Sequence, residues 1–162
     1  AIRALHHVVL GCDGSSNSMR AVQVLARLAP EPGTRLTLVR AIDAMYTPTQ
    51  GLVSADLRAT VAAEVVALNQ ARERQAHKEL SRVARTLSSS GWDVDQVVTT
   101  SAPLHALLAK VNAARADLLV VGATGASGLR HLVLGSVAEG ALNQCPAAVL
   151  VARAGAQVTR LT

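Results

Sequence analysis

The 162-residue chain is the length of one domain, and half of its residues are hydrophobic, so a full core is available. Aromatic residues are nearly absent (Trp92, Tyr46 and no Phe), so the core must be aliphatic, as in a parallel sheet covered by helices. The net charge of +5 is scattered, with no basic block and no interleaved aromatic residues, which argues against nucleic acid as a partner.

The first half of the chain alternates apolar runs with helical patterns. The run HHVVLGC, residues 6–12, predicts a buried strand, and Ser15 and Ser16 can cap the helix that follows it. Pro and Gly in residues 30–33 end that helix, and RLTLVRAI, residues 35–42, predicts the second strand.

A long helix is predicted over residues 55–89, which are rich in Ala, Arg, Glu and Leu. A straight helix of that length would span about 50 Å, which exceeds one small domain. We therefore expect a break or a loose start near its N-terminal third.

The second half of the chain predicts three more strands and two helices. The strands are WDVDQVVTT at 92–100, DLLVVGA at 117–123 and AAVLVAR at 147–153. Pro103 suits a first helical turn, and a short helix spans about 136 to 144. The alternation predicts an α/β fold with a single doubly wound five-stranded parallel sheet, order 3-2-1-4-5, and helices on both faces.

The sequence predicts a single domain and a cytoplasmic location. We expect a domain over residues 1–153 and a polar C-terminal tail over 154–162. Cys12 and Cys145 form neither a disulfide framework nor a metal-binding spacing. No signal-peptide pattern is present, and no apolar run reaches the roughly 18 residues that span a bilayer. We therefore expect a soluble, cytoplasmic protein without a membrane partner.

A ligand crevice is predicted where the strand order reverses, because open α/β sheets bind ligands beyond the carboxyl ends of their strands at that point. The first strand ends in GCDGSS, 11–16, and the fourth in GATGASG, 122–128. Glycines 122 and 125 would let a ligand approach the main chain. Asp13 could accept a hydrogen bond from a ribose hydroxyl or hold a divalent ion that accompanies phosphates.

Gly135 and Ser136 open the predicted short helix. The N–H groups at a helix start have no intrahelical acceptor, and together with the helix dipole they favour phosphate. The glycine-rich segment is therefore either a mobile connector or an anion cradle, and its spacing favours the cradle.

The pattern G-2x-G-9x-G-[S/T], made by Gly122, Gly125, Gly135 and Ser136, resembles the nucleotide-binding signature of the universal stress protein family, in its ATP-binding branch. The resemblance covers nearly the whole chain, including DGS after the first strand and CPAAVLVAR near the end. It implies binding of ATP, or of ADP or AMP, with Mg or Mn on the phosphates. It also implies a homodimer that pairs strand 148–152 with its mate.

The resemblance assigns candidate positions for the nucleotide. Adenine would lie near Asp13 and the backbone of Ala41, the ribose and α-phosphate near 122–125, and the outer phosphates near 135–137. Asp13 is also the candidate metal ligand. The candidate binding residues are Gly11, Cys12, Asp13, Ala41, Val121, Gly122, Ala123, Thr124, Gly125, Arg130, Gly135, Ser136 and Val137.

Some candidates have simpler alternative roles. Asp13 in DGS could simply form a turn, Ser136 could be a plain helix cap, and Arg130 could face solvent. Cys12 has no adjacent base in the sequence, which favours a buried, inert thiol. Ala123 and Thr124 stand where the family often has Ser and His, which leaves more of the binding to the main chain.

Enzyme motifs are missing from the sequence. There is no Gly-Lys pair of a Walker A loop, no kinase motif and no convincing general base for a terminal phosphate. We expect a regulatory module in which the nucleotide orders the two loops and residues 43–55 and so changes a dimer or partner surface. The alternatives are a slow Mg-dependent ATP hydrolase and a structural dimer with a vestigial pocket.

Overall fold

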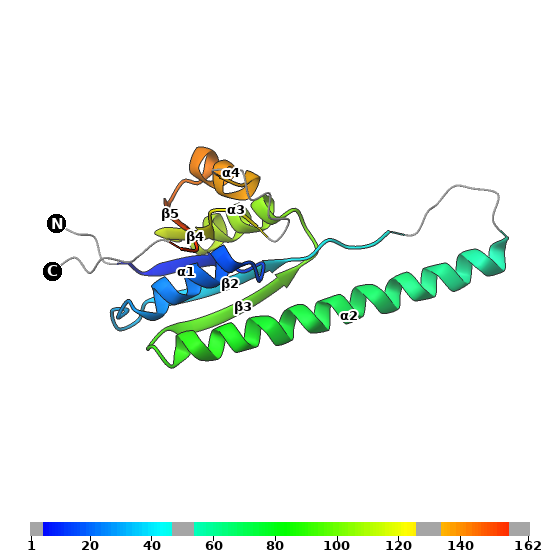
Figure 1. The fold of residues 1–162 in the computed structure, drawn as a ribbon, viewed down its shortest axis with the longest axis horizontal. Helices are drawn as coiled ribbons and strands as arrows, with labels where there is room; N and C mark the ends of the chain where they lie inside the picture. The colour runs from blue at the N-terminus through cyan, green and yellow to red at the C-terminus, as the bar shows by residue number, and fades with distance from the viewer. Residues whose placement is uncertain (1–4, 47–53, 126–133, 156–162) are drawn as a thin grey trace.

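The computed structural model describes residues 5–46, 54–125 and 134–155. Five parallel strands form one sheet in the order β3-β2-β1-β4-β5, which confirms the predicted topology (Figure 1). The strands are β1 (His7–Gly11), β2 (Arg35–Ala41), β3 (Asp93–Thr99), β4 (Leu118–Gly122) and β5 (Ala148–Ala152). The helices are α1 (Ser16–Ala26), α2 (Ala55–Ser88), α3 (Pro103–Ala114) and α4 (Ser136–Gln144).

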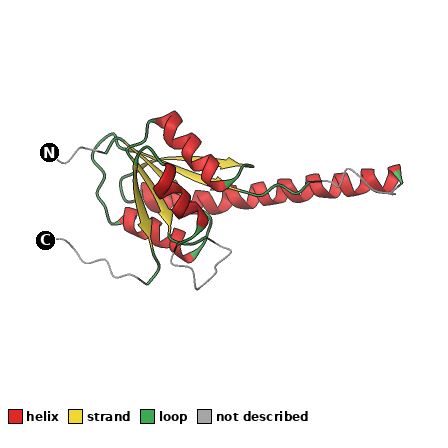
Figure 2. Cartoon of the chain, turned by 90° about the horizontal axis from the view of Figure 1, so that it is seen from above, coloured by secondary structure: helices red, strands yellow, loops and turns green. Residues whose placement is uncertain are grey.

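Two aliphatic cores lie on opposite faces of the sheet, and the helices seal both (Figure 2). Leu38 of β2 packs with α1 and α2, whereas the next residue, Val39, packs with α3 and α4. Successive side chains of a strand point to opposite faces, so an unbroken apolar run can fill both cores at once. This arrangement is why β1 and β4 consist of nearly continuous Val and Leu.

Local chemistry sets where the helices begin. The Ser15 hydroxyl accepts a hydrogen bond from the Ser18 N–H at 3.1 Å, which confirms the predicted cap of α1. Pro103 lies in the first turn of α3, as predicted. The cap of α4 is Gly135, and Ser136 is its first helical residue, so the alternative role of Ser136 as the cap is wrong.

The expected break in the long helix is wrong, because α2 is one helix of 34 residues. Its sequence holds no Gly or Pro between residues 55 and 88, and Ser54 caps it by accepting from the Leu57 N–H at 3.4 Å. The buried residues of α2 are Ala76, Leu80, Ala84 and Leu87, all in its second half. Its first half projects beyond the sheet (Figures 1 and 2). A helix need not stay within the span of its sheet, so the size of the domain does not limit the length of α2.

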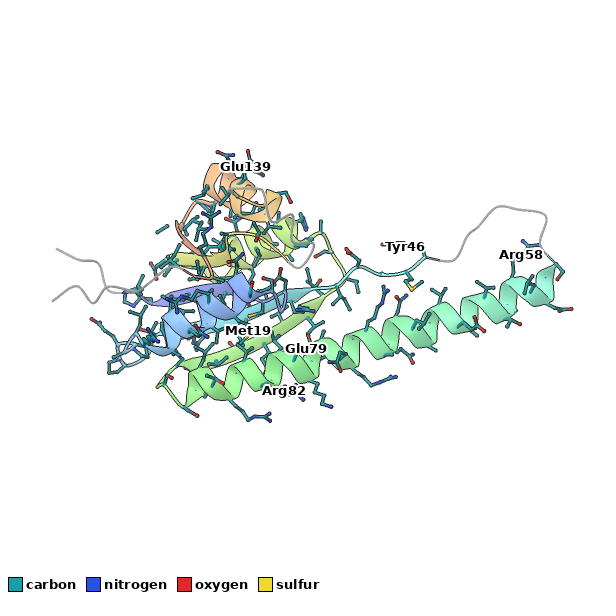
Figure 3. All side chains as sticks on the ribbon, in the orientation of Figure 1. Met19, Tyr46, Arg58, Glu79, Arg82 and Glu139 are labelled. Atoms are coloured by element: carbon teal, nitrogen blue, oxygen red, sulfur yellow. The ribbon has the colours of Figure 1, made fainter. Side chains whose placement is uncertain are left out.

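The chain that leaves β2 runs along α2 and is bonded to it. The Asn69 side chain accepts from the Met45 N–H and donates to the Met45 carbonyl, both at 2.9 Å. Arg72 donates to the Asp43 carbonyl at 3.2 Å. The last described residue of this segment, Tyr46, is 85% exposed and lies beside the projecting part of α2 in Figure 3. None of the helices among the described residues combines the length and apolarity needed to cross a membrane.

Candidate functional site

A cavity of about 1110 Å³ opens where β1, β2 and β4 end, at the predicted reversal of strand order. Such a position is typical of ligand sites in open α/β sheets. Every predicted binding residue that the structure describes lines this cavity: Gly11, Cys12, Asp13, Ala41, Val121, Gly122, Ala123, Thr124, Gly125, Gly135, Ser136 and Val137. Arg130 lies outside the described residues.

The signature glycines let parts of the protein itself come together. A Cβ on Gly122 would lie 2.8 Å from the Ser18 main-chain nitrogen, so the start of α1 sits directly on the end of β4. A Cβ on Gly125 would lie 2.9 Å from Oδ2 of Asp13. The sequence predicted that these two positions make room for a ligand; their immediate neighbours are instead α1 and Asp13.

The third glycine closes the far end of the loop. The Gly135 N–H donates to the Ala123 carbonyl at 2.7 Å, and a Cβ on Gly135 would meet the Thr124 Cα at 3.2 Å. These contacts bring the start of α4 against the end of β4. The first and last parts of the glycine-rich segment therefore lie side by side at the cavity.

Asp13 has a structural role at the cavity edge. Its Oδ1 accepts from the Ser15 N–H at 2.9 Å, which confirms the turn-forming alternative. Its other carboxylate oxygen faces Gly125, in the loop that follows the fourth strand. The carboxylate thus builds the turn and also lines the cavity.

The start of α4 presents main-chain donors to the cavity. Ser136, Val137 and Ala138 all line it, and no side chain of the described residues caps this helix end. The first-turn N–H groups of a helix have no acceptor inside the helix, and the dipole places partial positive charge there. This end of the cavity is therefore suited to an anionic group.

One wall of the cavity was not predicted, and it comes from α2. Its residues recur at intervals of three or four along one helix face: Leu68, Ala71, Arg72, Gln75, Ala76 and Glu79. The helical spacing was present in the sequence, but the orientation of the helix toward the strand ends was not. The other residues that sequence reasoning missed are Val39, Arg40, Ile42, Asp43, Pro103, Leu107 and Ala138.

An ion pair connects this wall to the strand ends. Arg40 at the end of β2 lies 3.3 Å from Oε2 of Glu79 and donates to the Cys12 carbonyl, also at 3.3 Å. The side chains are 21% and 39% exposed, so water screens the pair and its contribution is within about 1 kcal/mol. Figure 3 labels Glu79 where α2 passes the sheet. The pair orients the charges of the wall more than it stabilises the fold.

Cys12 is buried beneath the cavity. Loss of hydration on burial raises the pKa of its thiol to about 12, with smaller effects from Arg40 and Asp13. The thiol is therefore neutral at physiological pH, and its predicted burial is confirmed. Among the described residues there is no group of three or more His, Cys, Asp or Glu side chains that could hold a metal ion by itself.

Comparison with known proteins agrees with this fold. The universal stress protein family matches the chain over residues 4–153. The universal stress protein Rv1636 of Mycobacterium tuberculosis strain H37Rv is 31% identical over 152 residues, 89% of this chain and 93% of that protein. A crystal structure of a universal stress protein in complex with cAMP is 25% identical, with a TM-score of 0.60 over 93% of this chain and 98% of that one.

A more distant relative shows the same fold. The Arabidopsis thaliana protein At3g01520, of the same family and solved with AMP bound, is 15% identical, with a TM-score of 0.63 over 93% of this chain and 92% of that one. The family match includes all five strands and all four helices of the described structure. The chain belongs to the universal stress protein family.

Proposed function

We propose that this protein is a regulatory module of the stress response that binds an adenine nucleotide in the cavity at the strand ends. The observation that carries the proposal is that all described residues of the glycine signature line one cavity, with the start of α4 at its edge. Two relatives solved with AMP and with cAMP support adenine nucleotides as the ligand class.

In this proposal each part of the cavity meets one part of the nucleotide. Adenine lies near Asp13 and the backbone of Ala41, and the ribose and α-phosphate lie along 122–125. The outer phosphates accept hydrogen bonds from the main chain of Ser136 and Val137, where the helix dipole stabilises their charge. Main-chain donors recognise phosphate without a charged side chain, which suits a site where Thr124 and Ala123 are small.

The residues present fit a magnesium or manganese ion that arrives with the nucleotide. Mg²⁺ at nucleotide sites is held by one or two carboxylates together with phosphates and water. Asp13 is the carboxylate on the glycine side of the cavity, and Glu79 lies on the α2 side, paired with Arg40. Asp13 is therefore our candidate ligand, and the metal would neutralise phosphate charge.

In this proposal, nucleotide binding changes the surface through which the protein dimerises or contacts a partner. Strand β5 is at one edge of the sheet, so one side of its backbone has no partner strand within the described chain. Pairing with the same strand of a second copy would cover this edge. Nucleotide that orders the loops around the cavity would then alter dimer stability.

Ser136 offers a sharp test of the main-chain cradle. Ser136→Ala removes only the hydroxyl, whereas Ser136→Pro also removes the main-chain N–H at the first helical position, where proline is well tolerated. The preceding residue, Gly135, has φ −85° and ψ 160°, a conformation that proline accepts in the residue before it. Both variants are therefore expected to fold.

Isothermal titration with ATP, ADP, AMP and cAMP, with and without Mg²⁺, gives the readout. We expect the wild type to bind adenine nucleotides, Ser136→Ala to bind within about threefold of it, and Ser136→Pro to lose about tenfold, the value of one charge-assisted hydrogen bond. A wild type that ignores millimolar nucleotide would overturn the proposal and favour a vestigial pocket. Steady-state phosphate release with Mg²⁺ would reveal the slow hydrolase.

A further inference from the structure

Asn17, in the first turn of α1, connects two segments that are far apart in sequence. Its Nδ2 donates to the Thr124 carbonyl at 3.3 Å and to the Thr124 hydroxyl oxygen at 2.5 Å. Its Oδ1 accepts from the Ala154 N–H at 2.6 Å. One side-chain amide therefore holds the cavity loop after β4 and the chain just after β5.

The orientation of this amide follows from its partners. The Ala154 N–H can only donate, so the atom that faces it must be Oδ1. The Thr124 carbonyl can only accept, so the atom that faces it must be Nδ2. Both ends of the amide are thus matched, and a flipped amide would oppose like groups at both ends.

The reach of Asn17 depends on Gly122. A Cβ on residue 122 would lie 2.9 Å from both the carbonyl carbon and the Cβ of Asn17. Only glycine at the end of β4 lets the first turn of α1 approach so closely. The second residue beyond this contact is Thr124, which puts its main chain and hydroxyl within range of the Asn17 amide.

We propose that Asn17 is a positioning residue for the nucleotide, and this inference rests on the proposed function. By accepting from Asn17, the Thr124 hydroxyl is turned so that its own hydrogen can be donated toward the cavity, which Thr124 lines. The bond to the Thr124 carbonyl holds this residue in the same conformation before ligand arrives. Preorganisation of this kind raises affinity because less ordering is required on binding.

The same amide links the site to the edge of the sheet. Ala154 follows Arg153 and is the second residue after the end of β5, the edge strand. A ligand that fixes Thr124 therefore also fixes Asn17 and the Ala154 main chain. This is a short physical route from the cavity to the strand that we propose as the dimer edge.

Two substitutions at position 17 separate positioning from charge. Asn17→Ala removes all three bonds of the amide without adding charge, and we expect nucleotide affinity to fall about tenfold, the value of one to two hydrogen bonds. Asn17→Asp at pH 7.5 places a carboxylate next to the Thr124 carbonyl, which repels it, and the Thr124 hydroxyl donates to that carboxylate instead of toward the cavity. We expect a larger loss of nucleotide affinity.

Thr124 completes the test as a double-mutant cycle. Thr124→Val removes the hydroxyl and keeps the shape, and Thr124→Ser keeps the hydroxyl and should bind within about threefold of wild type. If Asn17 acts through Thr124, the double variant Asn17→Ala with Thr124→Val binds no more weakly than the weaker single variant. Asn112→Asp on the exposed face of α3 is the matched control for one added negative charge.

The outcomes are distinct. If wild type binds no adenine nucleotide, the proposed function fails and this inference falls with it. If wild type binds and Asn17→Ala binds equally well, or the two losses simply add, only the positioning role is overturned. Binding is measured well below each variant's melting temperature, and a variant whose melting falls while its affinity is unchanged also overturns the role.

Discussion

Gly122 and Ser18 lie so close together that a Cβ on residue 122 would come within 2.8 Å of the Ser18 main-chain nitrogen. Real side chains do not approach a backbone nitrogen so closely, and neither segment is free to move. Ser18 is buried in the first turn of α1, and Gly122 ends an internal strand. The packing of α1 on β4 thus requires glycine at position 122, whatever the cavity binds.

Gly122→Ala is therefore expected to destabilise the fold. Forced overpacking of this kind costs about 1–3 kcal/mol. The free energy of unfolding from urea titration is the measurement. Gly11→Ala is the matched control, because the atoms nearest to a Cβ there are the Leu107 methyl groups at 3.3 Å, and these can shift. Equal effects of the two substitutions would contradict the backbone contact as the cause.

The Cys12 thiol is expected to resist alkylation in the folded protein. Burial raises its pKa to about 12, so almost no thiolate exists at pH 8, and the thiolate is the reactive form. Iodoacetamide followed by mass spectrometry should modify the partly exposed Cys145 first and Cys12 only after urea is added. Rapid labelling of Cys12 without urea would show that the core opens locally.

His7 is expected to make the fold less stable in mild acid. Burial, then the charges of Lys110 and Arg35, lower the pKa of His7 below its ordinary 6.5. The unfolded chain therefore binds a proton that the folded chain does not, so the free energy of unfolding falls as the pH drops through 6.5 and below. Urea titrations between about pH 7.5 and pH 5 measure the slope.

His7→Gln should flatten that slope, because glutamine does not titrate and can still bond the Thr37 hydroxyl that His7 contacts at 2.8 Å. An NMR titration of the His7 ring gives an independent reading, with a midpoint below 6.5. An unchanged slope in the variant would assign the acid sensitivity to other groups.

The projecting half of α2 is expected to open more readily than the half that covers the sheet. All buried side chains of α2 lie at Ala76 or beyond, and an isolated helix of a few turns is marginal in water. Hydrogen exchange should be at least about tenfold faster over residues 58–68 than over 76–88. Asn69→Ala should also speed exchange of the Met45 amide, which donates to Asn69. Uniform protection along α2 would indicate that something covers its first half.

The strands and their order could be predicted because each internal strand of a parallel sheet buried on both faces is a continuous apolar run in the sequence. Val8, Val9 and Leu10 are fully buried, and so are Leu119 and Val120. Runs of this kind, separated by helical patterns, admit few topologies once crossovers are right-handed. The same reasoning put the ends of β1 and β4 at one crevice, and the predicted residues do line one cavity.

The extent of α2 could not be predicted from length alone. Its continuity depends on the absence of Gly and Pro and on bonds from Asn69 and Arg72 to the chain after β2. Those bonds join residues 24 and 29 positions apart. The size of the domain does not determine these bonds, so the length of α2 does not follow from it.

By itself, the sequence determined the order of strands and helices, the aliphatic cores and the glycine spacing around the cavity, because each of these follows from local periodicity and residue type. Only the tertiary structure decided what the glycines touch, that Arg40 pairs with Glu79, and that Asn17 joins Thr124 to Ala154. The contacts of Arg40 and Asn17 join residues 39 to 137 positions apart, and they arise from how packed layers meet rather than from any local pattern.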